Sequence, residues 1–98
     1  MAVAEISVVP IGTGSASISD YVVRAVKIVK ASGLKYELSS MGTNVEGEVA
    51  SILDLVRKIH DACLDEGAVR VLTTLKIDDR RDKRLSIEGK KAAVTGKV

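Results

Sequence analysis

The sequence predicts an α+β protein with a ferredoxin-like sandwich (βαββαβ), in which one four-stranded antiparallel sheet carries two helices on one face. The first observation is the order of hydrophobic periods, which run strand, helix, strand in each half of the chain. The second is a turn signal that joins the two halves as a hairpin. Right-handed crossovers then place both helices on the same side of the sheet.

The first half begins with a strand and a helix. Residues 3–9 alternate between apolar and polar side chains, which predicts a half-buried strand that Pro10 ends. The helix is expected from about Ser19, with Ser17 or Ser19 as its cap. Ser32-Gly33 is a typical helix end, so the helix should finish there.

The hairpin and the second half complete the sheet. A strand is expected over about 34–41, a turn at Gly42-Thr43-Asn44, and a strand over about 44–48. Apolar residues at helical spacing predict a helix from about Val49 to Glu66. The alternating segment of about 69–78 is the final strand, which this topology places at a sheet edge.

The length of 98 residues suits a single ferredoxin-like domain over 1–98, with a basic C-terminal segment from about residue 80. Residues 80–98 hold seven Lys or Arg against two acidic residues, a net of +5, whereas the rest of the chain is −3. A short helix is possible over 86–94 in this segment. A basic tail on an acidic body is not a uniform nucleic-acid footprint.

Composition argues against several classes of protein. No apolar run approaches the ~20 residues of a membrane span. No signal peptide is visible at the start, so a cytoplasmic location is expected. The single cysteine, Cys63, excludes an internal disulfide, and with His60 it supplies too few ligands for a metal site. We expect Cys63 to be a buried structural residue, and we expect no metal and no cofactor.

The alternation divides the predicted sheet into a face beneath the helices and an open face. The open face is expected to carry Glu5, Ser7, Glu37, Ser39, Met41, Asn44, Glu46, Leu72, Thr74 and Lys76. Three carboxylates against one lysine favour a cationic ligand, and the hydroxyls could orient a polar heterocycle. A solvated sheet face or a subunit contact is the alternative interpretation.

Two other features have a functional and a structural interpretation. The loop of residues 10–17 joins a strand to a helix, where free backbone N–H groups can bind an anion, but its glycines also suit a simple connection. The edge position of the last strand predicts a homodimer by edge pairing or through the open faces, and a tetramer if both are used.

Three segments resemble the small thiamine-binding (YkoF-like) family. They are the start over 4–13, the Ser40-Met41-Gly42-Thr43 turn leading to Glu46-Gly47, and the run over 73–81. The resemblance covers about residues 3–90 in the same order. It implies a ferredoxin-like fold, dimers or tetramers, and binding of thiamine or its hydroxymethylpyrimidine part without catalysis.

The resemblance also implies where the ligand binds. It places a pocket at the open face, near the Met-Gly-Thr turn and a subunit contact. The matching positions are Ser7, Ser40, Met41, Gly42, Thr43, Glu46, Thr74 and Lys76. The expected function is storage, delivery or sensing, with Glu5, Glu37 or Glu46 balancing the thiazolium cation.

Three other functions share this order of elements. The main alternative is an amino-acid-sensing regulatory module, which would change its assembly with an amino acid and ignore thiamine. A small ferredoxin-like enzyme would depend on His60, the only histidine. An RNA-recognition module would need sheet aromatics, and the chain has only Tyr21 and Tyr36. We expect a protein that is not an enzyme and binds neither nucleic acid nor a membrane.

Overall fold

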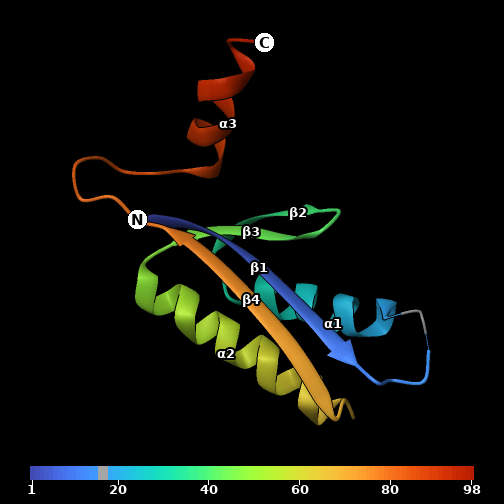
Figure 1. Cartoon of the computed structure of the whole chain (residues 1–98). Helices are drawn as coiled ribbons and strands as arrows, with labels where there is room; N and C mark the ends of the chain where they lie inside the picture. Colours follow the sequence, from blue (N-terminus) through green and yellow to red (C-terminus); the bar gives the residue numbers. More distant parts are fainter. Residues whose placement is uncertain (16–17) are drawn as a thin grey trace.

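The computed structural model describes residues 1–15 and 18–98. The elements are β1 (Ala2–Ile11), α1 (Ser19–Ala31), β2 (Lys35–Ser39), β3 (Gly42–Gly47), α2 (Val49–Asp65), β4 (Arg70–Asp78) and α3 (Ile87–Thr95). The strands form one sheet in the order β2-β3-β1-β4, and every neighbouring pair is antiparallel. Helices α1 and α2 cover one face of this sheet (Figure 1). The predicted α+β class and four-stranded antiparallel sheet are confirmed.

The core lies between the sheet and these two helices. On the sheet side it contains small and branched residues, and on the helix side it contains mostly isoleucine and leucine. The members are Ala2, Ala4, Ile6 and Val45 from the sheet, and Val29, Ile52, Leu55 and Ile59 from the helices. Within the described residues, no helix combines the length and the apolar character needed to cross a bilayer.

Strand β1 is longer than predicted, because Pro10 does not end it. Pro10 lies within β1 opposite Val71 of β4. The ladder to β3 ends four residues earlier, at the pair Ile6 and Thr43. Proline is tolerated here because one side of β1 has no partner strand, so the missing N–H can face an unpaired edge.

The β2–β3 turn lies two residues before the predicted position. Ser39 pairs with Gly42, so the turn residues are Ser40 and Met41, and Gly42 starts β3. Gly42 is required by strand packing instead: a Cβ there would lie 3.0 Å from the backbone oxygen of Ile6. The glycine therefore marks a close approach of β3 to β1, which sequence inspection took for a turn signal.

Helix α1 begins at Ser19 as predicted, but its cap differs from the prediction. The N-cap is Ile18, and Ser19 is the first helical residue rather than the cap. The other predicted cap, Ser17, lies outside the described residues. The predicted end is correct, since Ser32 is the C-cap and Gly33 has a φ of 77°.

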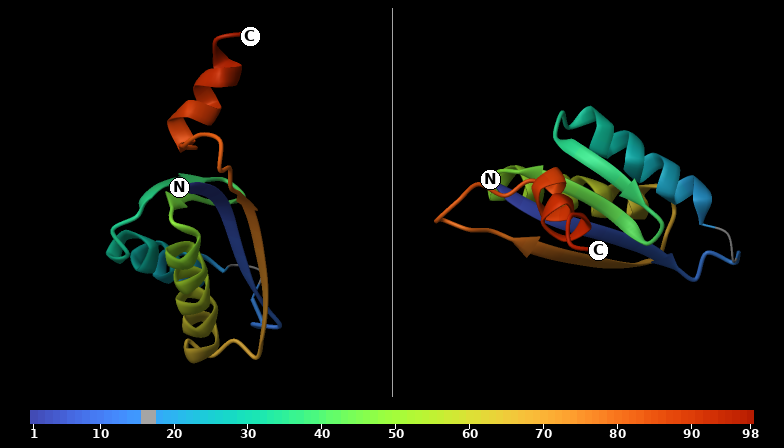
Figure 2. Two further views of the ribbon diagram at one scale, coloured as in Figure 1. Left: turned by 90° about the vertical axis from the view of Figure 1, so that its left-hand side faces the viewer. Right: turned by 90° about the horizontal axis from the view of Figure 1, so that it is seen from above.

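The structure contains a third helix, α3, whereas the predicted fold class has two helices. This helix matches the short helix expected in the basic segment. It lies on the side of the sheet opposite α1 and α2 (Figure 2). Ile87 in its first turn is buried, as is Leu85 just before it. Lys90 Nζ lies 2.6 Å from Asp78 Oδ2, and Lys91 Nζ lies 3.0 Å from Glu37 Oε2. The helix is thus fixed at its start and by two ion pairs to the edge strands.

Candidate functional site

The open face contains the predicted carboxylates, and each one has a lysine partner. Glu5 Oε1 lies 3.8 Å from Lys76 Nζ on the neighbouring strand β4. Glu37 is bound by Lys91 of α3. The third carboxylate, that of Glu46, is paired with Lys35.

Glu46 is the buried member of this set, with 6% of its surface exposed. Its Oε1 lies 3.6 Å from Lys35 Nζ, and Lys35 is opposite it on β2. A carboxylate at this depth needs a cation or hydrogen-bond donors, because its desolvation costs several kcal/mol. Glu46 and Lys35 therefore form a structural pair, and Glu46 has no free access to a ligand.

The remaining predicted open-face residues are exposed, except Ser7 and Asn44, which are half-buried. Thr74 lies on β4 opposite Ser7, and the side chain of Lys76 is 76% exposed. In this structure the open face thus offers matched ion pairs rather than an excess of negative charge. The hydrogen bond to Glu37 raises the pKa of Lys91.

A groove lies at the Met-Gly-Thr turn, but on the helix side of the sheet. We call it the hairpin groove; its volume is about 260 Å³. Its lining comes from β1, α1, the β2–β3 hairpin and one residue of α2. The lining residues are Ile6, Ser7, Val8, Val9, Ile18, Val22, Ala25, Val26, Val29, Leu38, Ser39, Ser40, Met41, Gly42, Thr43 and Ile59.

The groove exists because β1 pairs with its two neighbouring strands over different lengths. Strand β4 pairs with β1 as far as Ile11, whereas β3 stops pairing with β1 at Ile6. From Ser7 onward, β1 has a partner strand on one side only, and the space that a longer hairpin would fill is open. Backbone N–H and C=O groups at such an edge are available for a ligand.

The polar groups of the hairpin groove are hydroxyls. Ser39 Oγ donates to Gly42 O at 3.0 Å and so closes the turn. The hydroxyls of Ser40 and Thr43 have no hydrogen-bond partner in the part of the chain that the structure describes. Ser7 lines the groove from β1, but its side chain lies on the open face, because Ser7 pairs with Thr74. The groove lining contains no acidic or basic side chain. It is suited to a small uncharged ring with several polar substituents.

Five predicted site residues therefore meet in one place, and five do not. The groove contains Ser7, Ser40, Met41, Gly42 and Thr43. The others lie on the open face: Glu5, Glu37, Glu46, Thr74 and Lys76. Thr43 and Glu46 are an odd number of positions apart on β3 and point to opposite faces, so the hairpin groove does not bring all ten together, and their role in binding stays a prediction.

Sequence inspection missed the apolar wall of this groove. Val22, Ala25 and Val26 of α1 line it, yet their helical spacing indicated only core packing. The signal in the sequence that could have revealed this apolar wall was strand length. A first strand longer than the hairpin strands leaves part of its edge without a partner, and α1 lies across that part.

The other candidate groups have structural roles. Cys63 is buried as expected, and burial raises the pKa of its thiol. His60 Nδ1 lies 2.7 Å from Thr73 Oγ1 of β4. Over residues 1–15 and 18–98, no three His, Cys, Asp or Glu side chains are grouped to hold a metal ion.

The Gly/Ser loop remains a prediction as an anion site. Thr13 Oγ1 donates to Ser15 O at 3.0 Å, and Gly12 and Gly14 have φ values of 76° and 79°. The loop's last residue, Ser17, is outside the described residues.

Comparison with known proteins assigns the chain to a family. The model of the thiamine-binding protein family matches residues 4–95. The chain belongs to this family. A UPF0045 protein of Methanothermobacter thermautotrophicus is 43% identical over the whole of both chains. The UPF0045 protein YqgV of Bacillus subtilis is 42% identical over 92% of this chain and 90% of its own.

Solved structures show the same arrangement. The protein MJ1052 of Methanocaldococcus jannaschii is 39% identical with a TM-score of 0.87, over 99% of this chain and 97% of its own. A Thermotoga maritima protein, described as a candidate for thiamine biosynthesis or salvage, is 29% identical with a TM-score of 0.80, over 94% of this chain and 96% of its own. The resemblance noted in the sequence is therefore confirmed at the level of the family.

Proposed function

We propose that this protein binds thiamine or its hydroxymethylpyrimidine part in the hairpin groove, without catalysis, for storage, delivery or sensing. Membership of the thiamine-binding family supports the ligand class. The unpartnered hydroxyls of Ser40 and Thr43 beside an apolar wall support the place. This second observation carries the proposal, because it is independent of the family.

The chemistry of the groove favours the pyrimidine end of the ligand. An aminopyrimidine is flat and uncharged, and its ring nitrogens and amino group match hydroxyl donors and acceptors. The thiazolium cation would gain nothing from this lining, since no carboxylate lies in it. We therefore place the pyrimidine in the groove and any thiazolium ring at its open mouth, beside the exposed Met41.

Several finer features belong to the same proposal. We infer a ferredoxin-like fold from the sheet order β2-β3-β1-β4 and the two helices on one face. We also infer a cytoplasmic protein and a homo-oligomer, a dimer or tetramer. Strand β4 supports oligomer formation, because among the described residues it pairs only with β1, which leaves its outer edge for a second copy. Light scattering after gel filtration tests the oligomer.

A titration with hydroxymethylpyrimidine, thiamine and thiamine diphosphate tests the function. A ligand present at about 100 times its dissociation constant stabilises the native state by roughly 2.7 kcal/mol, which a thermal shift detects. We expect the pyrimidine and thiamine to bind with similar affinity, because only their shared ring enters the groove. Absence of a shift with all three compounds would overturn the proposal.

Two threonine variants locate the ligand. Thr43→Val removes a groove hydroxyl, so it should weaken pyrimidine binding by about 0.5–1.5 kcal/mol, the usual net contribution of one hydrogen bond. Thr74→Val makes the same chemical change on the open face and should leave binding as it was. Equal losses in both variants, or a loss only in Thr74→Val, would place the ligand elsewhere.

A further inference from the structure

A second groove lies between the end of α1 and the first half of α2. We call it the helix groove; its volume is about 310 Å³, and it shares no lining residue with the hairpin groove. Ile28, Leu34 and Leu55 form its apolar surface, and Ser51, Asp54 and Lys58 of α2 provide its polar groups. An apolar surface beside charged groups suits a small amphipathic ligand.

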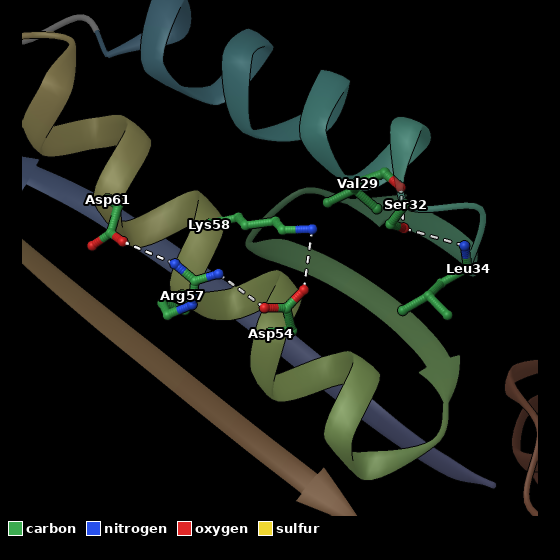
Figure 3. A network of polar contacts seen from close by, with 7 residues as sticks. All are labelled: Val29, Ser32, Leu34, Asp54, Arg57, Lys58 and Asp61. Carbon is green, nitrogen blue, oxygen red and sulfur yellow. Dashed lines mark hydrogen bonds and ion pairs between the residues drawn. The ribbon is translucent and has the colours of Figure 1, made fainter.

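The charges along this side of α2 balance one another (Figure 3). Asp54 Oδ1 lies 3.0 Å from Arg57 Nη2, and Asp54 Oδ2 lies 3.1 Å from Lys58 Nζ. Arg57 Nη1 also lies 3.5 Å from Asp61 Oδ2. Two acids and two bases leave no net charge, so a ligand with a single charge has no excess of the opposite sign to bind.

Both groove charges retain unused hydrogen-bonding capacity. An ammonium has three N–H donors and a carboxylate about four acceptor positions, and the mutual bond of Lys58 and Asp54 uses only part of each. The Ser51 hydroxyl has no partner among residues 1–15 and 18–98. By contrast, Ser32 Oγ donates to Val29 O at 2.5 Å and accepts from Leu34 N at 3.2 Å (Figure 3).

Asp54 stays ionised over a wide pH range. Its hydrogen bond with Arg57 lowers the pKa of the carboxyl, and the bond with Lys58 acts in the same direction. The groove therefore presents an ammonium and a carboxylate close together, next to apolar side chains. The complementary ligand carries a carboxylate and an ammonium on adjacent positions and an aliphatic group beside them.

We propose that the helix groove binds an aliphatic α-amino acid as its zwitterion. The ligand carboxylate contacts Lys58 and Ser51, the ligand ammonium contacts Asp54, and the side chain packs on Ile28 and Leu55. This inference goes beyond the proposed function and does not depend on it. It also gives a location to the amino-acid-sensing alternative that the sequence left open.

Amide chemical shifts of the full chain, followed by two-dimensional NMR, test the proposal with three probes. L-leucine carries both charges, isovalerate only the carboxylate, and isoamylamine only the ammonium. We expect leucine to shift the amides of Ser51, Asp54 and Leu34 saturably, at a concentration at least about tenfold below that of either analogue. Similar curves for leucine and one analogue, or shifts that never saturate, would overturn the zwitterion site.

Two lysine variants complete the test. Lys58→Met keeps the apolar stem and removes the ammonium, so leucine binding should weaken by about tenfold or more. Lys27→Met is the control, because Lys27 is an exposed residue of α1 outside the groove. An equal effect of the two variants would contradict the site.

Competition separates this proposal from the proposed function. Excess hydroxymethylpyrimidine should leave the leucine-dependent shifts unchanged, whether or not the pyrimidine itself binds. Leucine-dependent shifts at Ser7 and Thr43 in place of Ser51 and Asp54 would mean that the amino acid uses the hairpin groove, and would overturn the inference.

Discussion

The hairpin groove and the open face both contain predicted site residues, and they differ in how their strongest polar groups are satisfied. In the groove, the hydroxyls of Ser40 and Thr43 have no partner among the described residues. On the open face, each of the three glutamates is paired with a lysine of the same chain. The more strongly polar groups are thus the ones that the protein satisfies internally.

The difference follows from the cost of leaving each group unpaired. A carboxylate that loses water without gaining a cation or donors is costly, so folding selects arrangements that pair it. A hydroxyl at a groove wall keeps contact with solvent and costs little. On this sheet, the glutamates are therefore paired within the chain, whereas the hydroxyls beside the apolar wall keep their hydrogen-bonding capacity.

The largest effect is expected at Gly42, where the two regions meet. Gly42→Ala brings a Cβ to 3.0 Å from the backbone oxygen of Ile6, which can move only if β1 and β3 separate. We expect a loss of about 1–3 kcal/mol of unfolding free energy, measured by urea denaturation, together with weaker pyrimidine binding.

Gly47→Ala is the matched control for Gly42→Ala. Its Cβ would also lie 3.0 Å from a neighbour, but that neighbour is the terminal Cδ2 of Leu34, which can rotate away. We expect a smaller loss and unchanged pyrimidine binding. Equal losses at the two glycines would show that rigid contact with β1 is not the reason for Gly42.

Removing the lysine partner of Glu46 should have the next largest effect on the free energy of unfolding. Lys35→Met leaves a carboxylate with 6% exposure beside no lysine, so we expect a loss of about 1–2 kcal/mol in the free energy of unfolding. Adding Glu46→Gln to that variant should recover most of the loss. A double variant no more stable than Lys35→Met would mean that the pair contributes packing and not charge.

Lys76→Met should have a smaller effect on the same face. The side chain of Glu5 is 39% exposed and that of Lys76 76%, so solvent screens the pair and we expect a loss below about 1 kcal/mol. Pyrimidine affinity measured by calorimetry should not change. A clear change in affinity would return the ligand to the open face.

The smallest effect concerns α3 at high pH. Because Glu37 raises the pKa of Lys91 above 10.5, the stabilising contribution of this pair is complete below pH 10.5 and is lost as the pH rises through the folded-state value. Hydrogen exchange of α3 amides, corrected for intrinsic rates, should therefore become faster above that pH. Glu37→Gln should remove the step, and a step that persists in this variant would assign it to another group.

Much of the secondary structure could be predicted from hydrophobic periods. The second helix and the last strand lie within one residue of their expected limits, because Val49–Asp65 and Arg70–Asp78 have strong periodicity and clear ends. The hairpin turn could not be placed, since Gly42 is explained by contact with Ile6 and not by its own turn geometry. The prediction that Pro10 ends the first strand failed for a related reason. A proline is tolerated within β1 because the pairing of β1 with β3 stops at Ile6.

The candidate site was predictable in part. The Ser40-Met41-Gly42-Thr43 segment indicated the right end of the sheet, and the groove does lie there. The prediction placed the site on the open face because the carboxylates lie there, whereas the groove lies on the helix side. Neither the ion pair between Lys91 of α3 and Glu37 nor that between Lys35 and Glu46 could be predicted from the order of residues alone.

The sequence by itself determined the family, the alternation of strands and helices, and the buried face of each element, because these depend on local periodicity and on residue types. The tertiary structure alone decided which polar groups stay available to a ligand. That outcome depends on strand register and on contacts between distant residues. The pairing of β1 with β3 stops at Ile6, α1 crosses the open edge of β1, and lysines from three elements neutralise the glutamates.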